Sequence, residues 1–123
     1  MIRIDPRSTV SINEQIKNGL RGLIARGALR PGDAAPSIRG LAEILKVNPN
    51  TVARAVRELV MEGVLDVRRG EGTVVTDAAP GKAHSGLNDV RGRLRAGLHQ
   101  ARRDGLSWSD VEATVREARK EEP

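Results

Sequence analysis

The sequence predicts a mostly α-helical protein with one small β-hairpin. In most of the chain, apolar residues recur at spacings of three and four, which is typical of helices that bury one face. Only the stretches 64–68 and 73–76 switch to β-branched runs, with the glycine-containing string RGEG between them. At 123 residues, the chain can form one ordinary domain or one small domain with an appendage.

The first helix is expected from about residue 11 to residue 27. Ser11 can cap its start, and Glu14 would complete a capping box. The apolar face consists of Ile12, Ile16, Leu20, Leu23 and Ile24. Gly27 ends this helix, and the string LRPGD at 29–33 is typical of a turn.

Two short helices follow with almost no connection between them. Ser37 is placed to cap the second helix, which ends near Lys46. Asn48 is placed to cap the third, because Pro49 fits best at the first position of a helix. Gly63 would end that third helix. Helices joined so tightly cannot lie antiparallel side by side, so they are expected to cross steeply as a helix-turn-helix.

The β-hairpin that follows needs support from the helices, because an isolated two-stranded hairpin is marginal in water. Together they make a winged helix-turn-helix, the fold predicted for residues 1–76. Residues 77–86 show no apolar period and contain glycine and proline, so they are expected to be a linker. Residues 87–123 are expected to form two further helices, with Gly105 ending the first and Ser107 capping the second.

The charge of the chain favours a polyanionic partner. The formal net charge is +5 and the isoelectric point is about 10.7. Residues 1–76 hold 12 Lys or Arg against 8 Asp or Glu, whereas residues 77–123 hold 9 against 8. The excess therefore lies in the predicted winged domain, although many soluble proteins carry a similar charge simply to stay dispersed.

Several functional classes find little support. Cysteine is absent, which removes disulfides, thiolate catalysis and cysteine-type zinc sites and suits a reducing cytosol. No stretch approaches the roughly 18 apolar residues of a membrane span, and the N-terminus lacks the apolar core of a signal peptide. His84 and His99 have no metal-ligand pattern around them, and no phosphate-binding glycine loop follows a strand. We therefore expect a soluble cytoplasmic protein without catalytic residues, cofactor or metal.

The front of the third helix carries side chains that can read bases. The second helix of a helix-turn-helix, the recognition helix, lies in the major groove with its N-terminal residues at the base edges. Asn pairs with adenine, Arg with guanine, and a hydroxyl with several partners. The predicted base-reading residues are Asn48, Asn50, Thr51 and Arg54. Each alone could be a cap, a local hydrogen-bonding group or a solvated charge, but the combination with a tight turn and a wing favours double-stranded DNA.

Two other groups are expected to meet the DNA backbone. Ser37 and Arg39 combine a hydroxyl, a guanidinium and free helix N-terminal amides, which suits phosphate, although a cap beside a surface arginine is the alternative. The hairpin tip could approach the backbone or the minor groove. The predicted wing contacts are Arg68, Arg69 and Gly70. Glu71 in the same tip would repel phosphate.

A linked run of motifs resembles one family of DNA-binding domains. The motifs are PGD (31–33), PSIRGLA (36–42), VNPNTVARA (47–55), EGVL (62–65) and RRGEGTVV (68–75). They resemble the winged-helix domain of GntR-family transcriptional regulators over about residues 8–76. The string NPNTVARA together with so short a tail is most similar to the YtrA-type subfamily.

The resemblance implies DNA contacts at the serine and arginine of PSIR, at the front of the recognition helix and at the wing glycine with its basic neighbours. It also implies a homodimer built by the tail and control of a transporter operon. The sequence departs from the family pattern at Gly40, where glutamate is common, at Glu71, where a basic residue is frequent, and at Val74, where Phe is usual.

The tail has an apolar stripe that two helices cannot bury between themselves, so packing against a second copy is expected. The predicted dimer contacts are Leu87, Val90, Leu94, Leu98, Val111 and Val115. A dimer would place its recognition helices about 34 Å apart, or a small multiple of that, on a site with inverted symmetry.

The leading hypothesis is thus a dimeric repressor that binds a specific operator. A winged helix that binds another protein is the alternative, and an RNA-binding module is a third, although aromatic stacking residues are missing. Two tail helices supply few walls for a pocket of roughly 300 Å³ or more. The sequence identifies no small-molecule effector, and any such ligand would have to bind at the dimer interface or between tail and winged domain.

Overall fold

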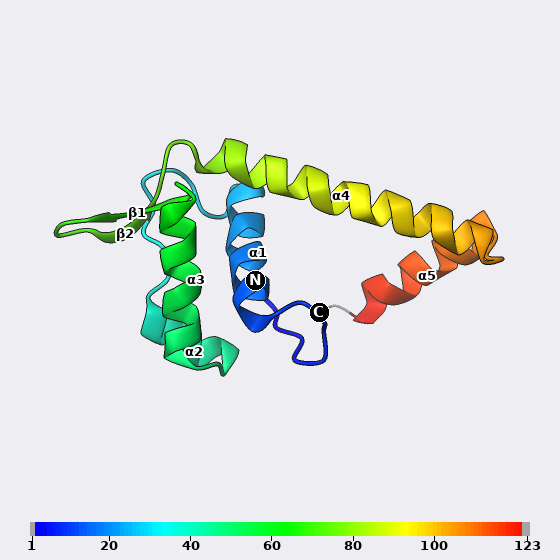
Figure 1. The fold of residues 1–123 in the computed structure, drawn as a ribbon, viewed down its shortest axis with the longest axis horizontal. Coiled ribbons are helices and arrows are strands. Elements are labelled where there is room, and N and C mark those ends of the chain that lie inside the picture. The colour runs from blue at the N-terminus through cyan, green and yellow to red at the C-terminus, as the bar shows by residue number, and fades with distance from the viewer. Residues whose placement is uncertain (1, 122–123) are drawn as a thin grey trace. The chain divides into compact units, whose positions relative to one another are not determined.

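The computed structural model describes residues 2–121. Over these residues the chain forms five helices and one two-stranded antiparallel sheet (Figure 1). The elements in chain order are α1 (Ile12–Ala25), α2 (Ile38–Leu45), α3 (Pro49–Met61), β1 (Leu65–Arg68), β2 (Gly72–Val75), α4 (Ala79–Arg103) and α5 (Trp108–Glu121). The chain divides into two compact units, one ending at Leu87 and the other beginning at Asn88. The fold class predicted from the sequence is confirmed.

Helix α1 begins as predicted. The hydroxyl oxygen of Ser11 accepts a hydrogen bond from the backbone N–H of Glu14, at 3.2 Å. The predicted capping box is not completed: the carboxylate of Glu14 pairs with the ammonium group of Lys17 at 3.3 Å instead of accepting from the backbone N–H of Ser11. The buried face of the helix is formed by Ile16, Leu20 and Ile24, all on the predicted apolar stripe.

Helices α2 and α3 form the predicted helix-turn-helix. Ser37 and Asn48 are their N-caps, and Lys46 closes α2 in the left-handed conformation, with φ of 56°. In Figure 1, α2 crosses the end of α3, while α3 lies alongside α1. The residues of α3 that are buried in the core are Val52, Ala55, Val56 and Leu59.

The two strands of the wing pair antiparallel, from Leu65 opposite Val75 to Arg68 opposite Gly72. The loop before α2 adds support that the sequence did not predict. Its backbone makes a bridge from Ala34 to Val74, and the N–H of Gly32 donates to the carbonyl of Val75 at 2.8 Å. This loop and the burial of Leu65 and Val75 attach the base of the wing to the domain.

The linker predicted at residues 77–86 is wrong, because helix α4 begins at Ala79. Ala79 and Ala83 are fully buried in the same core as the first three helices. Thr76 fixes the approach to α4 by donating its hydroxyl to the carbonyl of Gly63, at 2.6 Å. The packing uses small side chains one helical turn apart, which leave no pattern of large apolar residues in the sequence.

The second unit contains the rest of α4 and all of α5. Gly105, with φ of +114°, separates the two helices as predicted. Ser107 caps α5 in a reciprocal box: its hydroxyl accepts from the N–H of Asp110 at 3.0 Å, and its own N–H donates to the Asp110 carboxylate at 2.9 Å. The guanidinium of Arg102 lies 5.1 Å from the centre of the Trp108 ring. Among residues 2–121, no helix has the length and apolar character of a membrane span.

Candidate nucleic-acid interface

The two amide side chains at the front of α3 differ in which hydrogen-bonding atoms remain available to a ligand. Asn48 and Asn50 are both exposed. The side-chain oxygen of Asn48 accepts from the backbone N–H of Asn50 at 2.8 Å, as a helix cap does. Its NH₂ group remains available as a donor. Bidentate pairing with adenine needs the oxygen and the NH₂ together, so Asn50 is better placed for that contact than Asn48.

Arg54 follows Asn50 by one helical turn and is highly exposed, with 68% of its side chain accessible. Its Nε lies 3.9 Å from a carboxylate oxygen of Glu58. Thr51, which lies between the two in sequence, is half-buried. Helix α3 thus presents an amide, a hydroxyl and a guanidinium within one turn of each other.

Ser37 and Arg39 are exposed at the start of α2. The hydroxyl oxygen of Ser37 accepts from the N–H of Gly40 at 3.0 Å, which leaves the hydroxyl proton free to donate. A side-chain Cβ at Gly40 would stand only 2.8 Å from that oxygen, so the unusual glycine leaves the cap unobstructed. The arrangement can bind an anion such as a phosphate through the hydroxyl, the guanidinium and the backbone amides.

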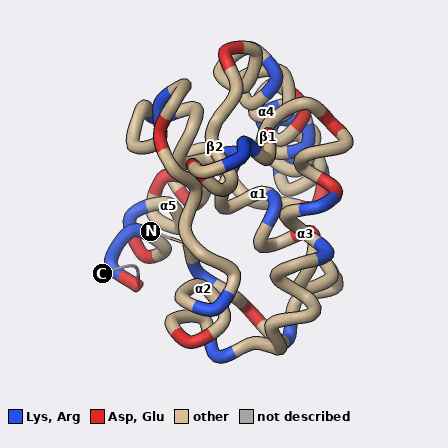
Figure 2. The backbone as a smooth tube through the Cα atoms, turned by 90° about the vertical axis from the view of Figure 1, so that its left-hand side faces the viewer, with Lys and Arg blue, Asp and Glu red and all other residues tan. Residues whose placement is uncertain are grey.

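The wing carries Arg68 and Arg69 at its tip, and both are exposed. The tip is a turn in which the N–H of Glu71 donates to the carbonyl of Arg68 at 3.0 Å, and Gly70 adopts φ of +82°. Figure 2 shows basic positions at the end of β1 facing the viewer, with basic and acidic positions interspersed along the helices. Arg68 also lies 3.5 Å from Asp66, which reduces the positive charge that it offers.

The predicted DNA-contacting residues all belong to the first unit. They lie on or beside α3 itself or the two elements α2 and β1 that pack against it. One exposed cation on α3 was missed from the sequence. Arg57 follows Asn50 by seven residues, close to two helical turns, so it lies on the same face of the helix. The helical spacing alone would have identified it.

A group of charges holds α3 against α1 behind this surface. The Lys17 ammonium lies 2.9 Å from Glu62, and Arg21 also pairs with Glu62. Burial lowers the pKa of Lys17, but hydrogen bonds and charges from Glu62 and Glu14 outweigh it and raise the pKa above its ordinary value. Burial raises the pKa of Glu62, but the hydrogen bonds and charges of Lys17 and Arg21 outweigh it and lower the pKa. Both groups are therefore held in their charged forms.

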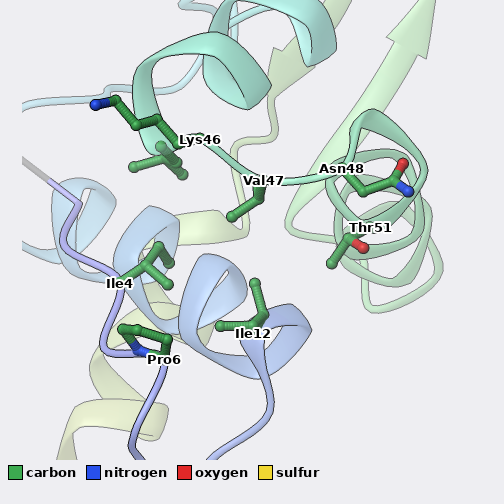
Figure 3. A pocket seen from close by; sticks show the side chains of 8 residues that line it. Ile4, Pro6, Ile12, Lys46, Val47, Asn48 and Thr51 are labelled. Atoms are coloured by element: carbon green, nitrogen blue, oxygen red, sulfur yellow. The ribbon is translucent and has the colours of Figure 1, made fainter.

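A pocket of about 480 Å³ lies beside the front of α3 (Figure 3). Its walls are mostly apolar and come from the N-terminal segment, the start of α1 and the turn between α2 and α3. The lining residues are Ile4, Pro6, Ile12, Leu45, Lys46, Val47, Asn48 and Thr51. In the close-up, the ammonium group of Lys46 points away from Asn48 and Thr51. A molecule bound here would touch two of the predicted DNA-contacting residues.

The six predicted dimer contacts differ in exposure. Val90, Leu94 and Val115 are exposed by 43%, 62% and 49% respectively. Leu87 and Leu98 are half-buried, and Val111 is buried in the second unit. Within residues 2–121, acidic and histidine side chains form no group of three or more that could hold a metal ion.

Comparison with known proteins is consistent with this geometry. Residues 12–75, more than half of the chain, match the profile of the family described as "Bacterial regulatory proteins, gntR family". Over 79 residues the chain is 47% identical to the HTH-type transcriptional repressor YtrA of Bacillus subtilis. That match covers 64% of this chain and 61% of the relative, so less than two thirds of the relative is spanned.

Solved structures extend the similarity to the tail. YtrA from Sulfolobus acidocaldarius, a GntR-family transcription factor, is 33% identical with a TM-score of 0.58, and the match covers 98% of each chain. The DNA-binding domain of AraR, solved in complex with operator ORX1, is 27% identical with a TM-score of 0.54. It covers 59% of this chain and 90% of that domain.

Proposed function

Because this chain belongs to the GntR family of bacterial regulatory proteins, it is a DNA-binding transcription regulator, and we propose that it represses transcription as a homodimer on an inverted-repeat operator. The observation that carries the proposal is the exposed set of hydrogen-bonding side chains at the front of α3. The similarity to a repressor and to an operator-bound domain supports it. The same surface gives little support to a protein-binding winged helix, which would favour a neutral or apolar face because charged residues are depleted at the core of protein interfaces.

The proposed contacts divide into two kinds. Asn50, Thr51 and Arg54 read base edges, and Asn48 donates from its NH₂ group. The predicted backbone contacts are Ser37, Arg39, Arg68, Arg69 and Gly70. Base contacts set the preferred sequence, whereas phosphate contacts supply affinity that falls with salt.

Two substitutions separate these roles. The probes are a duplex from the region upstream of the protein's own gene and a scrambled duplex of the same composition. Arg54→Ala should lower discrimination between them by roughly 1–3 kcal/mol, whereas Arg39→Ala should weaken binding to both alike and lower the salt slope by about 0.9. Equal affinity of the unmodified protein for the two duplexes would contradict sequence-specific binding.

The homodimer rests on the apolar stripe of the tail, where Leu94 is the most exposed predicted contact. Leu94→Gln should convert the protein from dimer to monomer in sedimentation and weaken binding to an inverted repeat. Ala96→Gln, at an exposed position of the same helix outside the stripe, is the matched control and should remain dimeric. A protein that is monomeric without any substitution would contradict the proposal.

The remaining parts of the proposal concern the regulated genes, the cellular location and a possible effector. The resemblance to YtrA-type regulators supports control of a transporter operon from the cytoplasm, and the genes beside this one would test it. A small-molecule effector remains a prediction. The pocket beside Asn48 and Thr51 provides a location that the sequence did not anticipate.

A further inference from the structure

The carboxylate of Glu58 connects α1 to the exposed face of α3 through two different oxygens. Its Oε2 accepts a hydrogen bond from the side-chain Nδ2 of Asn13, at 2.6 Å. Its Oε1 lies 3.9 Å from Nε of Arg54. The side chain of Glu58 is 31% exposed, whereas that of Arg54 is 68% exposed. The same carboxylate therefore has one oxygen fixed on α1 and the other beside the predicted base-reading arginine.

The fixed side of this carboxylate is well anchored. The ammonium group of Lys17 lies 3.9 Å from Oε2 of Glu58, and the Lys17 side chain is only 9% exposed. Lys17 is itself held by Glu62 at 2.9 Å and by Glu14 at 3.3 Å. The carbonyl oxygen of the Asn13 side chain is buried and has no hydrogen-bond partner among the described residues. The hydrogen bond to Glu58 is therefore the one that this side chain makes there.

We propose that Glu58 is a positioning residue that keeps the guanidinium of Arg54 along the face of α3 and away from the DNA backbone, and so raises sequence discrimination. This inference rests on the proposed base contact of Arg54. An arginine has a long flexible stem, and in a field of phosphates its guanidinium pairs readily with the nearest one. A carboxylate one helical turn away offers a competing partner that holds the guanidinium on the surface of α3.

Removing the charge of Glu58 should change affinity for two kinds of DNA to different extents. The freed Arg54 would gain a phosphate contact, so affinity for a duplex of scrambled sequence should rise and its salt slope should increase by about 0.9. Affinity for the preferred sequence should rise less or fall. The ratio of the two affinities should drop by roughly three- to tenfold, a part of what a full base contact supplies.

The test uses the full chain and two duplexes of equal length. One carries the sequence that the unmodified protein enriches most from a random duplex pool, and the other is a scrambled version. Glu58→Gln is compared with Glu43→Gln, which removes the same charge from an exposed position on α2 that has no ion pair among residues 2–121. Glu43→Gln should change affinity for both duplexes by the same factor. An equal change of both by Glu58→Gln would overturn the inference.

A second variant, Asn13→Ala, separates the positioning effect from a change of charge or a folding defect. Asn13→Ala changes no charge but releases Oε2 of Glu58 from α1, so it should lower the affinity ratio in the same direction as Glu58→Gln. Thermal unfolding is measured for every variant. A merely structural role would lower the melting temperature and leave both the ratio and the salt slope unchanged, and that result would also overturn the inference.

The Arg54→Ala background separates this inference from the proposed function. In that background Glu58→Gln should no longer change the affinity ratio, because the group that it positions is gone. If Arg54→Ala alone leaves the ratio unchanged, the proposed base contact has failed. If Arg54→Ala lowers the ratio while Glu58→Gln and Asn13→Ala do not, the positioning role of Glu58 has failed and the base contact stands.

Discussion

The ammonium nitrogen of Lys17 lies 2.9 Å from a carboxylate oxygen of Glu62, so the middle of α1 is tied to the residue that caps the end of α3. The lysine side chain is only 9% exposed, whereas that of Glu62 is 39% exposed. Glu14 and Glu58 lie at 3.3 and 3.9 Å from the same nitrogen. Charge as well as apolar packing therefore fixes the recognition helix on the domain.

Lys17→Ala should destabilise the domain by about 1–3 kcal/mol. This lies between the small contribution of surface ion pairs and the larger penalty for breaking a buried pair, because the carboxylates are partly exposed. Arg57→Ala removes an exposed cation from α3 and should change stability by less than about 0.5 kcal/mol. Urea denaturation measures both variants. Equal effects of the two would contradict a structural role for Lys17.

Stability should fall at both extremes of pH. The pKa of Glu62 is lowered in the folded protein, so its stabilisation is complete above the ordinary value of about 4.3 and is lost as pH falls through the folded value. The pKa of Lys17 is raised, so its stabilisation is complete below about 10.4 and is lost as pH rises through the folded value. Urea midpoints measured across pH should be highest between these two values and fall on either side.

Glu62→Gln provides the control for the acid side of that profile. It should make the loss of stability below about pH 4.3 shallower, because the carboxylate with the lowered pKa is gone. If stability falls as steeply below about pH 4.3 in Glu62→Gln as in the unmodified protein, other carboxylates cause that loss.

Asn48→Ala should mainly reduce stability, whereas Asn50→Ala should mainly reduce base discrimination. Asn48 caps α3 through its oxygen, so its replacement should reduce the free energy of unfolding by about 0.5–2 kcal/mol. The side chain of Asn50 is exposed, so its replacement should leave stability nearly unchanged and reduce discrimination at one base pair by roughly 1–3 kcal/mol. Chemical denaturation and binding to single-base-pair operator variants provide the two readouts.

Two glycines one turn apart in α1 should respond oppositely to alanine. A Cβ at Gly22 would have Arg26 at 3.8 Å as its nearest neighbour, so Gly22→Ala should stabilise the helix by up to about 1 kcal/mol. A Cβ at Gly19 would lie 2.7 Å from two side-chain carbons of Ile2. Gly19→Ala should therefore displace Ile2 from the core and give a net loss of about 1 kcal/mol. Thermal unfolding of the pair, with methyl spectra of Ile2, checks both.

The elements that the sequence predicted well are those set by contacts within a few residues. Ser11, Ser37 and Ser107 each accept a hydrogen bond from an N–H three residues later, and Asn48 accepts one two residues later. Such bonds depend only on the local string, so the starts of four helices were readable. The apolar face of α1 was readable for the same reason.

The features that were missed depend on partners far away in the chain. Ala79 and Ala83 look unremarkable in sequence, and only the folded core shows that they are buried. The contact between Asn13 and Glu58 spans 45 residues, and no local pattern marks it. Asn48, Asn50 and Arg54 are exposed as the helical spacing predicts, whereas Thr51 is half-buried. Their contacts with DNA stay a prediction that binding experiments must test.

The unbroken course of α4 from Ala79 to Arg103 has a consequence for how the tail forms. Starting a helix is the unfavourable step, whereas each further residue added to an existing turn is nearly neutral or favourable. The buried turns around Ala79 and Ala83 serve as a ready nucleus for the exposed residues beyond them, including Gly92 and Gly97, which would discourage a helix from starting on its own. In the monomeric Leu94→Gln variant, amide hydrogens should exchange faster with each turn away from that anchor, and a fragment of this variant lacking residues 1–76 should lose most of the helix.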